Sequence, residues 1–481
     1  MHQVAEQKTR PVSKLHDIYR GTIFQAVILG FISFTQPGIW SALNNLGAGG
    51  QAEPYVVNAA NVITYVIMTF GAPFSSVVSN IIGVKWVIAF GTLGYAPYSA
   101  SLYCNSAFGT QWFLIFGSSS ANTNKASALW SAEATVAVGY PEPARRGLCC
   151  NIWLALNKLG SIIASAIQLA LNKDGSETGS ISTKTYLVLI AIQCLGLPLA
   201  LLLAPPDKLV RTDGKTPTFS RHGRSWRAQT KEFFRILRRK EMLLLIPAFI
   251  TSEWGQTYQG NYLAAYFSVR ARALIGFLVA VVGALVNLLV GSWLDTRWAK
   301  RSTQARWTWC LTLALFTAMW IWYLVVQIRW AKEEPSIDWD DANFGVGAAL
   351  YILLRLAFEI ILVWLYWAVA AFDADADAIS VTVGILRGGV SLGMALSYGV
   401  GASRAASLLT NLVIALTVFF VSAPFTTWAA WLVPERLIGE DDDGEVIDGV
   451  VVETRAAEEA NAGSDAEVEK LGVQPKGEAV V

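Results

Sequence analysis

Twelve apolar stretches dominate this chain, and each is long enough to cross a lipid bilayer as a helix. A membrane-spanning helix needs about 20 mostly apolar residues, and stretches of this kind recur between residues 21 and 433. Apolar residues make up 54% of the chain and charged residues only 15%, which is more apolar surface than a soluble fold can bury. We therefore predict an all-α polytopic membrane protein with twelve transmembrane helices.

The predicted spans form two sets of six, separated by a polar segment. The spans run near residues 21–44, 55–80, 86–104, 111–138, 148–171 and 184–204, and then 242–266, 273–294, 307–328, 344–370, 380–401 and 406–433. The resulting organisation is an N-terminal arm (1–20), a first six-helix bundle (21–204), a basic central segment (205–241), a second six-helix bundle (242–433) and a tail (434–481). The tail is acidic and poor in aromatic residues, so we expect it to be disordered.

Lys and Arg residues in the short loops predict how the chain is oriented in the membrane. The N-terminal arm, the turn at residues 145–146, the central segment and the turn at 297–306 are basic and would share one side. The opposite loops carry little positive charge, apart from Arg270 and Arg272. We therefore expect both termini to lie in the cytosol.

The central segment ends in a stretch with helical spacing and a basic face, where Trp226, Phe233, Phe234 and Leu237 alternate with Lys and Arg. Such a helix would lie along the inner leaflet and be attracted by its anionic lipids. The membrane already accounts for these charges, so we predict no nucleic-acid partner.

Ionisable side chains inside the spans mark the candidate site, because a charge at the bilayer centre costs at least about 2.5–3.5 kcal/mol on insertion scales. Six lie deep in the predicted spans: Lys125, Lys158, Glu253, Arg355, Glu359 and Arg387. Uncharged polar residues accompany them in the first, fourth and seventh spans: Gln36, Asn44, Asn122, Asn124, Gln256 and Gln259. From this set we predict that Lys125, Asn122, Gln36, Glu253, Gln256 and Arg355 bind a small solute.

Two of these charges, Arg355 and Glu359, are spaced i to i+4 and would share one helix face within ion-pairing range. They could form a purely structural pair, or a solute or proton could compete for one partner. Glu253 could instead pair with Lys158 or Arg387 across helices. Glu359 or Glu253 is the predicted coupling group.

Lys125 has two explanations, since a long Lys side chain can also reach the membrane surface. The adjacent Asn122 and Asn124 favour a binding role. Pro37 and Gly38 would permit bending of the first span, and Gly389 and Gly393 would permit close packing of the eleventh.

Several other kinds of site are not expected. The three histidines, His2, His16 and His222, all lie outside the predicted spans, which leaves no embedded histidine for a metal site. The glycine-rich residues 47–50 lack the Lys-Ser/Thr ending of a phosphate-binding loop. We predict no metal, no cofactor and no enzymatic activity.

A short basic turn follows the second span of each half, at residues 80–85 and at residues 291–295 with Arg297, Lys300 and Arg301 beyond it. This arrangement resembles the loop motif that major facilitator transporters carry once per six-helix half. The resemblance implies the major facilitator fold, with two six-helix bundles, and a gating role for Lys85, Asp295 and Arg297.

Further strings resemble the uncoordinated-93-like family in its fungal form. They lie at residues 34–40, 139–143, 210–214, 266–274 and 366–367. The resemblance implies one of two functions, which the sequence leaves open. One is a secondary transporter that moves a small solute by alternating access, coupled to protons; the excess of embedded basic groups favours an anionic or zwitterionic solute. The other is a regulator or trafficking partner of other membrane proteins.

Overall fold

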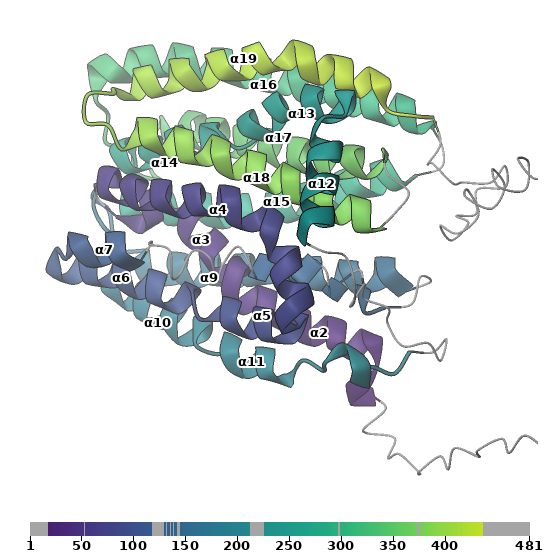
Figure 1. The fold of residues 1–481 in the computed structure, drawn as a ribbon. Coiled ribbons are helices and arrows are strands. Elements are labelled where there is room, and N and C mark those ends of the chain that lie inside the picture. The colour runs from purple at the N-terminus through teal and green to yellow at the C-terminus, as the bar shows by residue number, and fades with distance from the viewer. Residues whose placement is uncertain are drawn as a thin grey trace, which may run out of the picture.

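The computed structural model consists almost entirely of helices that run roughly parallel in two groups (Figure 1). It describes residues 18–51, 53–117, 129–130, 132–134, 136–137, 139–141, 145–211, 226–296, 299–372 and 376–435. Within these ranges, side chains are described except at residues 72–82, 146–147, 226–229, 295 and 376–380.

Helices coincide with all twelve predicted spans, although the fourth is described only in part. The first half contains α2 (Thr22–Ser33), the π-helical turn η1 (Phe34–Gly38), α3 (Ile39–Asn45), η2 (Ala48–Gly50), α4 (Pro54–Ile82), α5 (Val84–Thr92), α6 (Tyr95–Phe108), α7 (Gln111–Gly117), α9 (Arg146–Asn172), α10 (Thr183–Gln193), α11 (Gly196–Leu202) and η4 (Pro206–Lys208). The second half contains α12 (Trp226–Leu237), α13 (Lys240–Thr251), α14 (Gly255–Tyr266), α15 (Val269–Asp295), α16 (Arg301–Glu333), α17 (Phe344–Ala370), α18 (Ala376–Gly401) and α19 (Leu408–Leu432). By length and apolar composition alone, eight helical stretches among the described residues can cross a membrane.

Each half packs around its own apolar core. In the second half, Tyr262 of α14 stacks on Trp330 of α16 with ring centroids 5.6 Å apart, and the Tyr258 hydroxyl donates to Gln327 at 2.7 Å. In the first half, Leu29 and Ile32 of α2 pack with Val136 of the fourth span. Close packing inside each core favours movement of each half as a unit.

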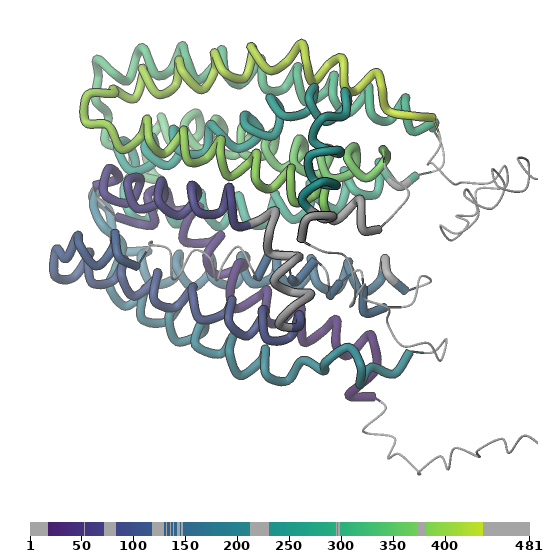
Figure 2. The backbone as a smooth tube through the Cα atoms, viewed as in Figure 1, coloured from purple at the N-terminus to yellow at the C-terminus, as the bar shows by residue number. Residues whose placement is uncertain are grey.

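The halves meet along two helix pairs, α4 with α18 and α9 with α15, and the first of these is visible where the purple and light-green tubes run side by side in Figure 2. These contacts leave long helix surfaces of the two halves facing one another. Movement between the halves would therefore change the packing of these two pairs.

Glycine residues permit close packing of helices in both halves. A Cβ atom on Gly393 of α18 would lie 1.8 Å from the carbonyl oxygen of Ile250, and one on Gly160 of α9 would lie 2.5 Å from that of Phe34. The backbone itself fills the space that a side chain would need. This agrees with the small-residue packing predicted for the eleventh span.

The predicted central helix is present as α12, and Ile236 is fully buried in the core of the second half. Phe233 and Leu237 pack against the same core. The apolar face predicted to contact lipid is therefore used, at least in this part, for packing against the protein.

The acidic loop after α16 explains why Arg270 departs from the charge rule. Its Nε atom donates to both carboxylate oxygens of Asp338, at 2.8 and 2.7 Å, and its Nη2 atom donates to Asp340 at 2.9 Å. Backbone hydrogen bonds hold the loop in place, with Ser268 donating to Ile337 at 2.9 Å. The hydrogen bonds from Arg270, followed by that from the Ser268 hydroxyl, lower the pKa of Asp338 to about 2.

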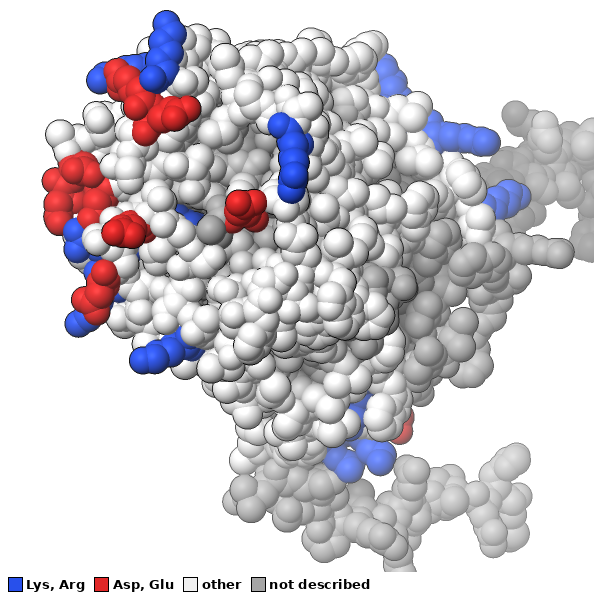
Figure 3. All heavy atoms as spheres, turned by 90° about the vertical axis from the view of Figure 1, so that its left-hand side faces the viewer, with Lys and Arg blue, Asp and Glu red and all other residues white. Residues whose placement is uncertain are grey.

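We refer to the end that carries this loop, together with residues 46–53, 173–182 and 402–407, as the predicted outer end. Figure 3 looks onto the side of the molecule that lies on the left in Figure 1, and there acidic and basic side chains lie beside one another on a mainly uncharged surface. The positive charge of Arg270 is thus neutralised locally.

The Asp338→Asn substitution should destabilise the protein at neutral pH, and the effect should fade in acid. The folded-state pKa lies below the unfolded value of about 3.9, so the stabilisation is present above that value and is lost as the pH falls towards 2. The difference in melting temperature between wild type and variant in detergent should start to shrink below about pH 4 and vanish near pH 2. The exposed Asp174 provides the control, Asp174→Asn; a pH-independent difference for Asp338→Asn would contradict the assignment.

Candidate functional site

The first span of each half is interrupted near its middle. In the first span, α2 passes into the π-helical turn Phe34–Gly38 before α3, and this turn contains Pro37, which lacks a backbone donor. In the seventh span, α13 ends at Thr251 and α14 begins at Gly255, so residues 252–254 separate two half-helices. The Trp254 carbonyl in this break accepts a hydrogen bond from Ser397 at 2.5 Å. The π-helical turn thus lies at Pro37 and Gly38, where the sequence permits bending, and the seventh span is interrupted at a comparable position.

Glu253 lies in the seventh-span break, within electrostatic range of side chains from both halves. Tyr65 of α4 and Tyr398 of α18 stack with centroids 5.4 Å apart and ring planes at 15°. Glu253 and Arg355 both lie within electrostatic range of these two tyrosines. A carboxylate and a guanidinium therefore share a tyrosine-lined centre to which both bundles contribute.

The principal embedded ion pair joins the two halves. Lys158 of α9 lies 3.1 Å from the Glu359 carboxylate of α17, and the same carboxylate accepts from Asn287 of α15 at 2.8 Å. The predicted contact partner of Glu359 was Arg355, and that expectation is wrong among the described residues, because the carboxylate binds Lys158. The alternative pairing of Glu253 with Lys158 is wrong for the same reason.

Arg355 makes no ion pair with any residue that the structure describes. It lies within electrostatic range of Glu359, Tyr351 and Tyr65 without contacting a carboxylate directly. Its guanidinium is therefore available to an anionic group. Arg387 differs, since it lies over the rings of Trp130 and Tyr366, at 4.9 and 5.1 Å from their centroids, and contributes to the contact between the bundles.

The structure describes only two of the other four residues that were predicted to bind a solute. Gln36 is fully buried, and its Nε2 atom donates to the Gln193 carbonyl at 2.7 Å within the first half. Gln256 is half-buried at the start of α14. Asn122 and Lys125 lie outside the described residues.

The predicted gating residues can be followed only in part. Lys85 lies just after Gly83, whose φ of 95° suits glycine, and its Nζ donates to the Leu201 carbonyl at 2.9 Å. Arg297 and the Asp295 side chain lie outside the described part of the chain.

The position of Arg272 could not be predicted from the sequence, where it stands out only as an exception to the charge rule. Arg272 is fully buried at the predicted outer end, at the start of α15. It donates to four backbone carbonyls of the first half, those of Leu46, Gly47, Gln51 and Gly179, at 2.8, 2.8, 3.3 and 2.8 Å. Asn58 adds contacts at 2.9 Å to Asn261 and to the Gly401 carbonyl. The halves are thus fastened together at this end.

The sequence analysis also missed Glu133 of the fourth span. Its side chain is fully buried, and it accepts a hydrogen bond from the Ser33 hydroxyl at 3.1 Å. A single acidic residue within the apolar run at 127–138 was the available signal. It was overlooked because it lies towards the end of the predicted span.

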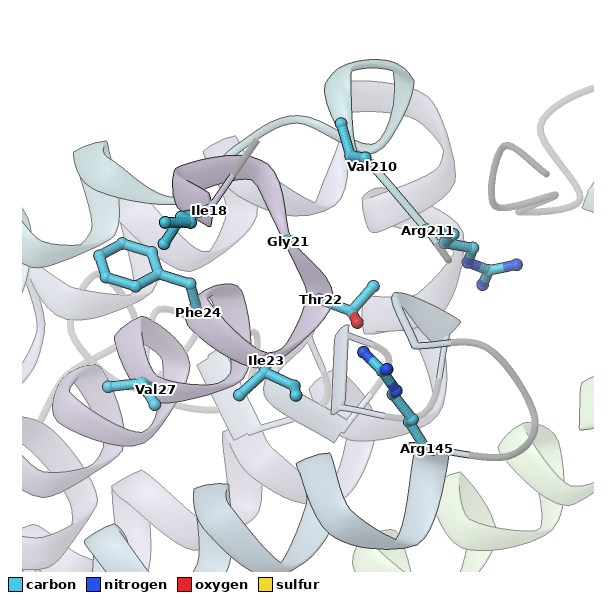
Figure 4. Close-up of a pocket in the computed structure, with 9 residues that line it drawn as sticks. All are labelled: Ile18, Gly21, Thr22, Ile23, Phe24, Val27, Arg145, Val210 and Arg211. Carbon is cyan, nitrogen blue, oxygen red and sulfur yellow. The ribbon is translucent and has the colours of Figure 1, made fainter. Parts of the chain in front are cut away.

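Two surface pockets lie away from this centre. One, of about 460 Å³, is lined by apolar residues around Phe24 and Val27, with Arg145 and Arg211 on one side (Figure 4). Three carbonyls, those of residues 139–141, already accept hydrogen bonds from Arg211. The other, of about 210 Å³, lies near Tyr55 and Asn411. Neither contains a predicted solute residue.

The chain matches the family model of the Major Facilitator Superfamily over residues 21–398. The chain belongs to this superfamily. It is 32% identical over 407 residues to the notoamide biosynthesis cluster protein O' of Aspergillus versicolor, which covers 84% of this chain and 87% of that protein. It is 28% identical over 417 residues to an UNC93-like protein of Schizosaccharomyces pombe, with 82% of each covered. It is 24% identical over 451 residues to UNC93-like protein 1 of Arabidopsis thaliana, with 92% and 97% covered.

Solved structures confirm the fold prediction. The xylose transporter XylE from E. coli aligns with a TM-score of 0.60 at 12% identity, over 89% of this chain and 99% of that one. The nucleoside transporter NupG aligns with a TM-score of 0.54 at 12% identity, over 85% and 98%. These likenesses confirm the fold, and the UNC93-like relatives confirm the predicted family. The protein is a multi-pass integral membrane protein of a transporter superfamily.

The pair Lys158–Glu359 should show strong energetic coupling, because each charge left alone in the membrane interior would be poorly solvated. Substituting each residue by Gln, singly and together, should give a coupling energy of about 1–3 kcal/mol in a double-mutant cycle. Chemical unfolding in detergent measures it. The exposed pair Arg329–Glu333, at 2.9 Å, should give only about 0.3–0.5 kcal/mol. Equal coupling for the two pairs would contradict the assignment.

Proposed function

We propose that this protein is a secondary transporter whose two bundles rock around a small-solute site between the broken first and seventh spans. The observation that carries the proposal is the pair of interruptions at corresponding positions of the two halves, at residues 34–38 and 252–254. In transporters with internal repeats, interrupted helices in matching positions point to the binding site. The alternating-access fold of the superfamily supports the same mechanism.

The charges at this centre favour an anionic or zwitterionic solute. Arg355 has no carboxylate partner among the described residues, so an anionic group of the solute can satisfy it. Glu253 lies within reach of the same two tyrosines and can receive a cationic group. A solute that carries both charges would satisfy both residues at once.

Proton coupling follows from the same residues. In this conformation Glu359 is held by Lys158 and Asn287, which makes Glu253 the better placed of the two predicted coupling groups. Protonation of Glu253 would remove its charge and weaken its attraction for the cationic group of the solute. Proton binding and solute binding would then be linked through one side chain.

The contacts of Arg272 and Asn58 support a conformation that is closed at the predicted outer end. With both termini in the cytosol, as the loop charges predict, the solute would exchange with the cytosol in this state. Release of these hydrogen bonds would accompany opening to the other side. The bending needed at the centre would take place at the two interrupted spans.

A solute screen tests the proposal. Purified protein in detergent should melt at a higher temperature with one or more anionic or zwitterionic solutes, because a ligand that binds only the folded state stabilises it. Saturation at about 100 times Kd corresponds to about 2.7 kcal/mol. Arg355→Ala and Arg355→Lys should reduce the shift and the uptake of that solute into proteoliposomes, whereas Arg329→Ala, at an exposed site, should not.

Two results would count against transport. The first is that a solute stabilises the protein but its uptake is unaltered by Arg355→Ala and Glu359→Gln. The solute would then not pass through the site that contains these residues. The second is well-folded protein that responds to no solute at any pH tested. That second result would favour a regulator or trafficking partner of other membrane proteins.

A further inference from the structure

Glu133 is a buried acid that the solute site does not use. It lies on the fourth span inside the first bundle, where its side chain has no exposed surface. Its Oε2 atom accepts from the Ser33 hydroxyl at 3.1 Å, and Asn157 donates to the same Ser33 oxygen at 2.8 Å. Its Oε1 atom has no hydrogen-bond partner among the described residues.

Among the residues that the structure describes, no cation is placed to balance a charge on this carboxyl. Among the described residues, Tyr95 of α6 is the ionisable group within electrostatic range. Arg387 of α18 reaches the same part of the fourth span, but its guanidinium lies over the ring of Trp130, 4.9 Å from the centroid. The indole nitrogen of Trp153 on α9 lies close to the Glu133 carboxyl group. It makes no hydrogen bond of acceptable geometry with any described residue.

This environment suits a neutral acid and not a carboxylate. A buried charge without a partner or water is so costly that a carboxyl group takes up a proton instead. A neutral acid accepts at its carbonyl oxygen and donates from its hydroxyl. Ser33 supplies the donor to Oε2, which assigns the proton to Oε1, and no acceptor for Oε1 lies among the described residues. The contrast with Glu359 is direct, since that carboxylate has both Lys158 and Asn287.

We propose that Glu133 is a proton-binding site of the first bundle, occupied in this conformation and emptied when the first span bends. The hydrogen-bond donor Ser33 is the residue immediately before the π-helical turn Phe34–Gly38. Movement at that turn would shift the Ser33 hydroxyl and admit water, and the proton would pass from the carboxyl oxygen to that water. This inference rests on the proposed transport function and adds a second acid to Glu253.

The proton on Glu133 can be detected without knowing the solute. Infrared spectra of the protein in nanodiscs at neutral pH should contain the carbonyl stretch of a protonated carboxylic acid. Glu133→Gln should remove the signal of one such group completely, and Glu359→Gln should leave it unchanged, because Lys158 and Asn287 hold Glu359 as a carboxylate. Ser33→Ala should shift the band, since the carbonyl oxygen loses its donor.

Spectra that are identical in wild type and Glu133→Gln at neutral pH would overturn the proposal. If Glu133→Gln does not fold, Ser33→Ala supplies the test, and a protonated-acid band that is unshifted in that variant would overturn the proposal. Neither result would bear on solute binding by Arg355, so the two proposals fail separately.

The role in coupling has its own measurement, made with any solute that passes the screen above. Glu133→Gln should retain solute exchange between the two sides of a proteoliposome membrane and lose accumulation driven by a pH gradient. If Glu133→Gln accumulates the solute as wild type does, the proton on Glu133 has only a structural role. That result would contradict the release of this proton during transport.

Discussion

The absence of water inside a bilayer is the constraint on which this structure depends. Every charged or polar group within the spans must find its partners in the protein or stay neutral. Four side chains meet this demand in three ways: Lys158 and Glu359 pair across the bundles, Arg272 donates to four backbone carbonyls, and Glu133 is held by a hydroxyl. The ion pair Lys158–Glu359 and the hydrogen bonds of Arg272 join the halves. Polar groups that are costly to place in a membrane therefore also determine how the bundles pack together.

The membrane class, the twelve spans and a helix irregularity at Pro37 could be predicted from the sequence, because they depend on local composition and on the missing donor of proline. The pairing of Glu359 could not. Helical spacing shows that Arg355 and Glu359 share a face, but the distance from Glu359 to Lys158 depends on how α9 packs against the second half. Arg272 was missed for a related reason, since its partners are backbone carbonyls that leave no trace in a sequence. Glu133 carried a signal, a lone acid in an apolar run, that was given too little weight.

In the transport cycle that we propose, these contacts would have separate roles. Arg272 and Asn58 fasten one end of the bundles, while the ion pair between α9 and α17 holds them near the centre. The two interrupted spans supply the places where helices can bend, and Glu253 and Arg355 lie beside them. A solute that binds these two residues would act where a small change of helix geometry alters the fit of the halves.

The most direct test is the distance between the halves at the predicted outer end. Spin labels at Ser176 and Ser403, both exposed there on opposite halves, can be placed in a chain whose five cysteines have been replaced. The account predicts a short distance in wild type and an additional longer population in Arg272→Gln, with no change for labels at Ala107 and Ser176 within the first half. A single unchanged distance in wild type and in folded Arg272→Gln, at every pH and with every solute tested, would contradict it.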